Sequence, residues 1–269
     1  MKIIKSKNKL QKVINNEKKI GFVPTMGGIH LGHLSLVKRS IKECNKTIVS
    51  IFVNKSQFNK INDFNKYPRN LKKDIKWLKK LKIDILYLPS EKDIYPKGPK
   101  KNIKLHSFAK TLCGKYRPGH FKAVVDVVER FIKIIKPSRI YFGEKDIQQL
   151  KLVENYIYPI YKDINVVECK TIREKNGIAY SSRNLLLNKK QIKIASKVYK
   201  IIKINKKKIL VSSKFLKIVK NKILSIGVKK IEYLKVVNIN KVIKPFKKKE
   251  RNKILLSYYL EQIRLIDNI

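Results

Sequence analysis

The sequence has few cysteines and no long apolar run, and both absences exclude whole classes of protein. Its three cysteines are Cys44, Cys113 and Cys169, an odd number without C-x-x-C spacing. This pattern predicts neither a disulfide framework nor a zinc site. No apolar run approaches the roughly 18 residues that span a bilayer, and no apolar segment of a signal peptide follows the basic N-terminus. We therefore expect a soluble, cytoplasmic protein without a membrane partner.

Acidic residues are also scarce, with 19 Asp and Glu against 65 Lys and Arg, which gives a formal net charge of +46. A basic chain of this kind binds nucleic acid or an anionic membrane, or its surface has drifted toward lysine under codon bias. Only nine of the basic residues are arginine and 56 are lysine. Nucleic-acid surfaces use arginine freely for forked contacts. The abundance of Lys, Asn and Ile favours drift in an AT-rich genome and no specific nucleic-acid partner.

Two common nucleotide-binding signatures are absent, the G-x-G-x-x-G turn and the Walker A lysine loop. A different glycine-rich turn, Pro24–His33, lies between an apolar run at Ile20–Val23 and a helical pattern at Leu34–Ile41. Its glycines let backbone approach a ligand closely, and the helix N-terminus favours negative charge. His30 and His33 are three residues apart and share one helical face. The turn predicts a phosphate site for a nucleotide, with a metal site or a purely structural role as alternatives.

Apolar spacing predicts alternating strands and helices over the first 172 residues. Continuous β-branched strands alternating with amphipathic helices are typical of a parallel sheet covered on both faces, an α/β fold. The expected strands are 3–4, 20–23, 47–53, 83–89, 139–142 and 165–169, and the expected helices are 10–14, 34–41, 70–81, 107–113, 123–135 and 147–156, with loops at 63–69 and 96–99.

The pattern changes after residue 172. A helix of about twenty residues is expected from Lys189, a second over 213–226 with Gly227 as its stop, and two strands at 231–237 and 254–259. These elements predict a small C-terminal α+β domain. We expect domain 1 at residues 1–172 and domain 2 at 173–269.

Three polar stretches near predicted strand ends suit phosphate or substrate binding, although each has an ordinary structural explanation. Lys145, in the turn Gly143–Asp146, suits neutralisation of an α-phosphate during adenylyl transfer, yet charged turns are common. Ser181–Arg183 offers hydroxyls and a guanidinium for phosphate, or is a polar linker. Gln57 and Gln149 suit the hydroxyl and carbonyl groups of a small substrate, but lone glutamines indicate nothing.

Taken in order, seven segments resemble the motif series of the pantoate–β-alanine ligase family, within the cytidylyltransferase-like nucleotidyltransferases. The resemblance covers nearly the whole chain and implies a Rossmann-like domain, a smaller closing domain and a homodimer. It implies condensation of (R)-pantoate with β-alanine through a pantoyl adenylate, with ATP and Mg²⁺, releasing AMP and pyrophosphate. The segments are Pro24–His33, Val49–Phe58, Tyr67–Arg69, Arg117–Phe121, Phe142–Leu150, Arg173–Asn184 and Arg264–Asn268.

The resemblance also implies roles for individual residues. His33 matches the proton donor, and His30 and Lys145 complete the catalytic set. Gln57 and Gln149 match the residues that bind pantoate and β-alanine, and no residue matches a resident metal ligand. The ATP-binding positions are Met26, Gly27, Gly28, Ile29, His30, Leu31, Gly32, His33, Gly143, Glu144, Lys145, Asp146, Ile172, Tyr180, Ser181, Ser182 and Arg183.

Five positions depart from the family pattern: Lys55 for proline, Leu31 for a polar residue, Ala123 for glycine, Asn176 for aspartate and Tyr180 for a smaller side chain. None of them removes a group assigned to chemistry, so they bear on rate and stability. The alternative within enzymes is a related nucleotidyltransferase that moves AMP to a phosphate acceptor. Such an enzyme needs basic groups where this chain has glutamines.

Overall fold

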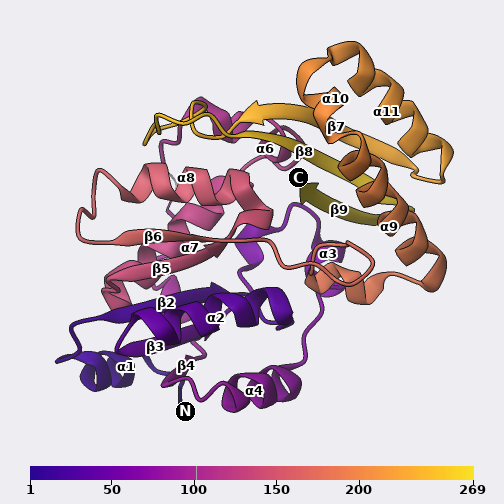
Figure 1. Cartoon of the computed structure of the whole chain (residues 1–269). Helices are drawn as coiled ribbons and strands as arrows, with labels where there is room; N and C mark the ends of the chain where they lie inside the picture. The colour runs from indigo at the N-terminus through magenta and orange to yellow at the C-terminus, as the bar shows by residue number, and fades with distance from the viewer. Residues whose placement is uncertain (101) are drawn as a thin grey trace.

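The computed structural model describes residues 1–100 and 102–269, and it contains two sheets (Figure 1). The larger sheet is parallel throughout the pairs of its six strands. This confirms the predicted α/β fold. Its spatial order is β1 (Lys2–Ile4), β4 (Ile85–Tyr87), β3 (Lys46–Ile51), β2 (Ile20–Thr25), β5 (Arg139–Gly143) and β6 (Asn165–Cys169).

Helices cover both faces of this sheet, because successive strand residues point to opposite sides. Phe22 and Ile48 pack in a core with helices α1, α7 and α8, whereas Val23 and Val49 pack on the other face with α2 and α4. Burial on both faces explains the unbroken apolar runs of the strands. The bounds are α1 (Lys7–Ile14), α2 (Leu31–Glu43), α4 (Leu71–Lys80), α7 (His120–Ile135) and α8 (Ile147–Ile157).

Short helices and 3₁₀ turns occupy the connections between these elements. They are η1 (Lys55–Gln57), α3 (Ile61–Asn65), α5 (Glu91–Ile94), η2 (Ser107–Lys110), α6 (Cys113–Tyr116), η3 (Glu144–Asp146) and η4 (Ser182–Leu186). The predicted loop at 63–69 therefore begins inside α3, and the predicted helix at 107–113 divides into η2 and the start of α6. Helix α5, which was not expected from the sequence, begins at a capping box between Ser90 and Asp93.

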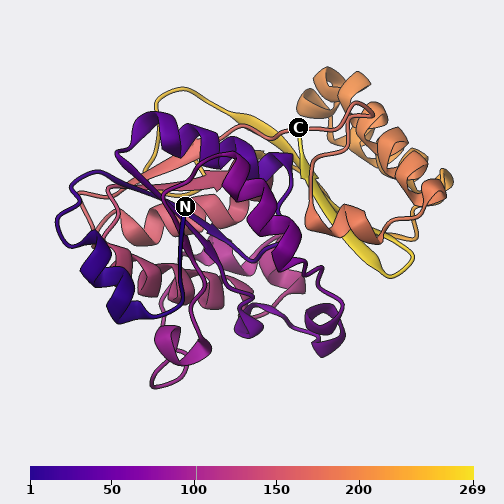
Figure 2. The same ribbon diagram turned by 90° about the horizontal axis from the view of Figure 1, so that it is seen from below.

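The smaller sheet is antiparallel, in the order β7 (Lys230–Asn238), β8 (Asn252–Leu260) and β9 (Ile263–Asn268). One of its faces packs against helices α9 (Lys189–Ile204), α10 (Lys206–Val211) and α11 (Ser213–Ser225) through residues such as Ile254 and Leu256. Leu255, between them, packs into the core of the larger sheet. The strands thus run between the two parts of the molecule (Figure 2), and the predicted α+β arrangement is confirmed.

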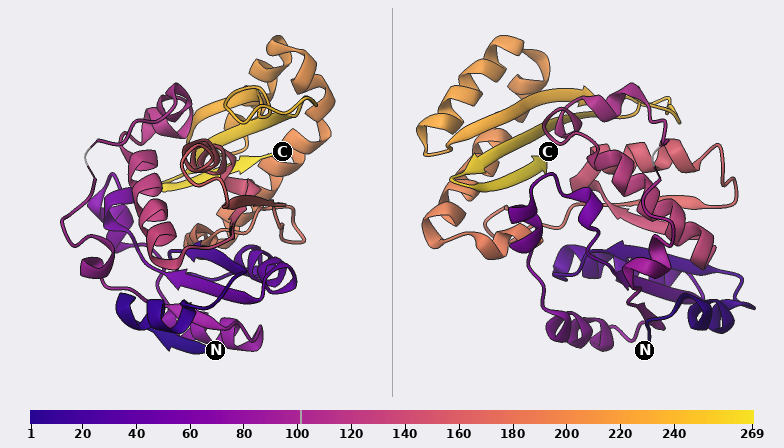
Figure 3. Two further views of the ribbon diagram at one scale, coloured as in Figure 1. Left: turned by 90° about the vertical axis from the view of Figure 1, so that its left-hand side faces the viewer. Right: turned by 180° about the vertical axis from the view of Figure 1, so that it is seen from behind.

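Two details of this part differ from the prediction. The expected twenty-residue helix is broken at Asn205, whose side chain donates to the carbonyl of Ile201 at 2.8 Å and closes α9. Strand β9 was not predicted, because its short run carries the polar residues Arg264, Asp267 and Asn268. Helix α6 lies against the same sheet (Figure 3). The Tyr116 hydroxyl there donates to the carbonyl of Glu232. Among the described residues, no helix is long and apolar enough to span a bilayer.

Candidate active site

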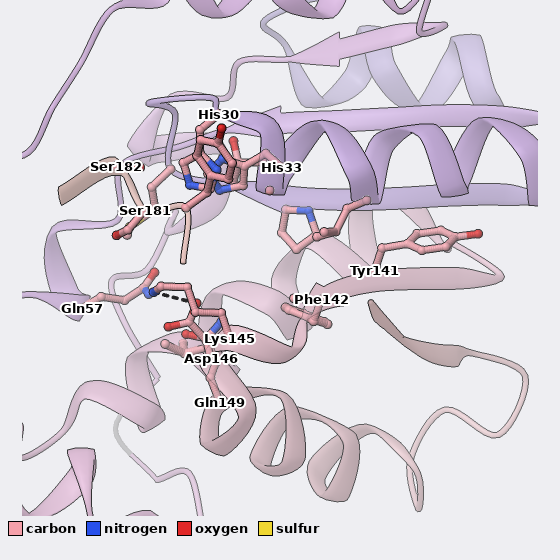
Figure 4. Close-up of a pocket in the computed structure, with 18 of the residues that line it drawn as sticks. His30, His33, Gln57, Tyr141, Phe142, Lys145, Asp146, Gln149, Ser181 and Ser182 are labelled. Carbon is pink, nitrogen blue, oxygen red and sulfur yellow. Dashed lines mark ion pairs between the residues drawn. The ribbon is translucent and has the colours of Figure 1, made fainter. Parts of the chain in front are cut away.

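A cavity of about 240 Å³ opens at the carboxyl ends of the parallel strands (Figure 4). Open parallel sheets bind ligands at this edge, because loops from neighbouring strands converge there. Its walls come from the loops after β2, β3, β5 and β6, from α7 and the turn before it, and from the segment that leads into η4. The predicted site residues on these walls are Met26, His30, Gly32, His33, Gln57, Gly143, Lys145, Asp146, Gln149, Ile172, Tyr180, Ser181, Ser182 and Arg183.

Five predicted ATP-binding residues are not on the cavity wall: Gly27, Gly28, Ile29, Leu31 and Glu144. Leu31 points outward with 44% of its surface exposed, and Ile29 is buried in the core. Glu144 is buried, with its carboxylate paired to cations of the smaller sheet. Their nucleotide roles stay predictions.

The glycine-rich turn is anchored to the protein through Asp74 of α4. The Asp74 carboxylate, 2% exposed, accepts hydrogen bonds from the backbone N–H groups of Gly28 at 2.9 Å and Ile29 at 2.8 Å. Burial raises the pKa of Asp74, and the two backbone hydrogen bonds oppose that rise. These two N–H groups are therefore engaged by the protein itself, although the sequence suggested that the turn presents them to a ligand.

Gly28 has a second structural role, because it brings two parts of the site together. Its φ of +62° is a left-handed conformation that glycine adopts without strain. A Cβ at this position would lie 2.9 Å from the Ser182 hydroxyl, which donates to the Gly28 carbonyl at 3.2 Å. The Ser181–Arg183 segment is thus packed directly on the glycine-rich turn, as neither segment's sequence indicated.

The two histidines stack on each other at the start of α2, with ring centroids 4.0 Å apart, and Tyr180 stacks 6.1 Å from His30. Burial, and then the neighbouring His33 and Lys145, lower the pKa of His30 to about 2. Burial also lowers the pKa of His33 to about 4, although Asp146 counteracts it. Both rings are neutral at pH 7. Among the described residues, neither buried Nδ1 atom has a hydrogen-bond partner, and both rings line the cavity.

The metal-site alternative requires a third protein ligand beside this pair. Within residues 1–100 and 102–269, no group of three or more His, Cys, Asp or Glu side chains is placed to hold a metal ion. Across the cavity, the stacked imidazoles face a wall that carries one lysine, one aspartate and one glutamine.

This facing wall is formed by η3 and the first turn of α8. Lys145, Asp146 and Gln149 project from it toward the cavity, opposite the histidines (Figure 4). The Lys145 side chain is only 17% exposed, and its Nζ lies 3.8 Å from Asp146 Oδ2. A largely desolvated ammonium group interacts strongly with an anionic ligand, because little water screens it.

Gln57 is placed by two residues to which the sequence gave no role. Its backbone carbonyl accepts from His120 Nδ1 at 2.9 Å and from Arg117 Nη2 at 3.1 Å. Both residues line the cavity, as does Tyr67. Burial and the adjacent Arg117 keep the pKa of His120 well below its usual range, so His120 is neutral. Their segments contributed to the family resemblance, but nothing in residue type alone separates these positions from ordinary turn residues.

Arg183 is already paired in this structure. Its Nη2 donates to the Asp63 carboxylate at 2.8 and 3.2 Å, and Asp63 belongs to α3. Both partners remain partly exposed, so exchange of this carboxylate for a phosphate costs little. Asp63 is a further residue without a predicted role.

The neutral histidines predict an unusual pH dependence of stability. Unfolded His33 titrates near pH 6.5, whereas the folded residue titrates at about 4, so the unfolded chain binds its proton first as the pH falls. Stability is therefore lost between pH 6.5 and 4. Replacement of His33 by Gln is expected to reduce that loss by roughly 1–3 kcal/mol, measured by urea unfolding at both pH values. Equal losses in wild type and variant would contradict a depressed His33 pKa.

Comparisons with known proteins agree along the whole chain. A sequence model of the family Pantoate-beta-alanine ligase matches residues 2–269. The pantothenate synthetase of Fervidobacterium nodosum is 38% identical over 277 residues, covering 100% of this chain and 99% of the relative. That of Francisella philomiragia is 41% identical over 268 residues, covering 99% and 95%.

Solved structures give the same result. The pantoate–β-alanine ligase of Francisella tularensis, crystallised with beta-gamma ATP and β-alanine, has a TM-score of 0.86 at 38% identity, with 100% of this chain and 97% of that chain covered. The pantothenate synthetase of Thermus thermophilus has a TM-score of 0.90 at 30% identity, with 100% and 99% covered. With its sequence and its fold matched from end to end, this chain belongs to the pantoate–β-alanine ligase family.

Proposed function

We propose that the protein condenses (R)-pantoate with β-alanine to form pantothenate, using ATP and releasing AMP and pyrophosphate through a pantoyl adenylate. The observation that carries the proposal is one cavity with two neutral imidazoles on one wall and an ammonium group with a glutamine amide on the facing wall. The imidazoles and the ammonium group suit phosphates, and the glutamine amide suits a small carboxylic acid. The relative from Francisella tularensis was crystallised with an ATP compound and β-alanine in the same fold.

In the first step a pantoate carboxylate oxygen attacks the α-phosphorus of ATP. The new O–P bond replaces the bond to the β-phosphate oxygen, and pyrophosphate leaves. Gln57 and Gln149 hold the pantoate, while the Lys145 ammonium stabilises the charge that grows on the α-phosphate oxygens. Little covalent chemistry falls to the protein, so positioning and electrostatics supply the rate.

The histidines act on the phosphates that leave. In the free protein His33 is a neutral hydrogen-bond donor, since burial lowers its pKa to about 4. Bound polyphosphate raises this pKa, because a nearby negative charge favours the imidazolium form. His33 can then donate a proton to the pyrophosphate, as the family resemblance implies. Ser182 and Arg183 complete this side of the nucleotide site.

Mg²⁺ fits this arrangement as an ion held mainly by the nucleotide. Magnesium binds through one or two carboxylates together with substrate phosphates and water. Asp146 is the one acidic side chain on the described cavity wall, beside Lys145. Asp146 would supply the protein ligand, and the ion would neutralise part of the polyphosphate charge.

In the second step the amine of β-alanine attacks the activated carbonyl. The new C–N bond replaces the C–O bond to AMP, the nitrogen loses a proton to water, and AMP leaves. Water would destroy the adenylate, so the site must be covered. With domain 1 at residues 1–172 and domain 2 at 173–269, we propose that domain 2 closes over the site and excludes water. Support comes from Ser182, which follows the division and already bonds to Gly28 at 3.2 Å.

From the family resemblance we further propose a homodimer located in the cytoplasm. We attribute the charge of +46 to lysine drift rather than to a nucleic-acid partner. Nonspecific lysine contacts weaken steeply with salt, so RNA binding that survives high salt would contradict this attribution.

The reaction is tested by supplying ATP, pantoate and β-alanine and measuring AMP and pantothenate. Without β-alanine, exchange of labelled pyrophosphate into ATP is expected to depend on pantoate, because the adenylate forms reversibly. Transfer of AMP to a phosphate acceptor instead would favour the alternative nucleotidyltransferase.

Adjacent glutamines allow a matched test of the pantoate site. Gln149 lines the cavity, whereas Gln148 accepts from the Cys113 N–H at 3.0 Å and donates to the Phe108 and Thr111 carbonyls, both at 2.8 Å. Gln149→Ala is expected to raise the KM for pantoate about tenfold with little loss of stability. Gln148→Ala should lower stability and leave that KM unchanged. An unaltered pantoate KM in the Gln149 variant would remove it from the pocket.

A further inference from the structure

The backbone of the lysine turn is held by a side chain of the smaller sheet. Asn268, in β9, is 2% exposed. Its Nδ2 donates to the carbonyl of Glu144 at 2.7 Å and to the carbonyl of Lys145 at 2.9 Å. One amide group thus bridges two successive carbonyls of η3. Because buried hydrogen bonds to backbone are costly to leave unmade, this contact fixes the orientation of the turn.

Asn268 is itself fixed from two sides. Its backbone N–H donates to Asp267 Oδ1 at 2.8 Å, and its carbonyl accepts from Arg173 Nη2 at 2.8 Å. Arg173 also forms a forked pair with the Asp267 carboxylate, at 2.7 and 2.9 Å. Bidentate arginine–carboxylate pairs have a defined geometry. The amide of Asn268 therefore reaches the lysine turn from a rigid support.

A neighbouring strand holds the side chain of the same turn. The buried carboxylate of Glu144 pairs with Lys253 of β8 at 2.5 Å and with Arg251, which directly precedes that strand. Lys145 belongs to the same turn, and its side chain faces the cavity. Contacts from the smaller sheet to Glu144 and to the Lys145 backbone therefore determine the position of Lys145. The smaller sheet contributes no side chain of its own to this wall of the 240 Å³ cavity.

We propose that Asn268 is a positioning residue for Lys145, acting through the two carbonyls of η3. The proposal rests on the proposed function, in which the Lys145 ammonium stabilises charge on the α-phosphate. A displacement of about 1 Å in a catalytic group can cost a hundredfold in rate. Loss of both amide donors frees the turn to shift while the pocket wall stays otherwise complete.

Asn268→Asp tests the proposal, because it keeps the shape of the side chain and removes both donors. Pantoate-dependent pyrophosphate exchange is expected to fall at least about tenfold, with the KM for pantoate within about threefold of wild type. The matched control is Asn205→Asp. Asn205 is a half-buried asparagine whose Nδ2 donates to the Ile201 carbonyl at 2.8 Å, at the junction of α9 and α10. The control is expected to lose stability but to keep its exchange rate.

A double variant separates positioning from a general structural effect. In a Lys145→Ala background, Asn268→Asp is expected to cause no further loss of exchange, because the group that it positions is gone. An equal loss in both backgrounds, or a loss matched by Asn205→Asp, would overturn the proposal. Where the aspartate variant fails to fold, Asn268→Ala and Asn205→Ala carry the same expectations. Absence of pantoate-dependent exchange in wild type would instead overturn the proposed function, and this inference with it.

Discussion

Lys145→Ala is expected to lower the rate of pantoate adenylation by about a thousandfold and to leave the fold intact. Removal of one preorganised donor that faces developing charge typically costs two to three orders of magnitude. Lys145 carries a full charge and is only 17% exposed, so its effect belongs at the upper end. The fold is maintained because the Lys145 ammonium forms a 3.8 Å ion pair with Asp146 and is not part of the core packing.

Rapid-quench measurement of the pantoyl adenylate in a single turnover checks this expectation directly, because it isolates the first step from amide formation. Lys162→Ala is the charge-matched control, since Lys162 is exposed before β6. This control should form the adenylate at the wild-type rate. Adenylate formation in the Lys145 variant at a near-normal rate would remove Lys145 from the chemistry, whatever its effect on overall turnover.

The sequence predicted the fold well where local pattern and tertiary position agree. Strands buried on both faces must be apolar throughout, so runs such as those of β2 and β3 were recognisable. Strand β9 was missed for the opposite reason. Asp267 contacts Arg173, and Asn268 contacts η3. The polar residues of β9 are therefore explained by partners distant in sequence, and they do not form the apolar pattern by which a strand is predicted.

The candidate site shows the same division. Convergence of the glycine-rich turn, the lysine turn and the two glutamines followed from their places at strand ends. The residues that hold these segments in place could not be predicted in the same way. Asp74 was indistinguishable from a solvated charge in a lysine-rich helix, except that it shares a helical face with buried Leu78. A carboxylate on an apolar stripe is the one signal that pointed to a buried partner.

Gly32→Ala is expected to lower adenylation about a hundredfold without lowering stability. A Cβ at position 32 would lie 2.9 Å from both Cε1 and Nδ1 of the His30 ring. The ring must therefore move, and the stack with His33 at 4.0 Å changes with it. A shift of about 1 Å in a positioned group is enough for this loss of rate. Alanine also favours the helical backbone by up to about 1 kcal/mol over glycine, which offsets the strain in α2.

The rate effect and the stability effect thus have different causes, and two measurements separate them. Pyrophosphate exchange should fall while the thermal unfolding midpoint stays within a few degrees of wild type. The reference is His30→Ala, in which the ring that meets the new Cβ is absent, so Gly32→Ala should cost nothing further there. An additional loss in that background would place the effect in the backbone of the turn. Wild-type exchange in the single variant would show that the ring has room to move, and the binding of phosphate by His30 would lose its geometric support.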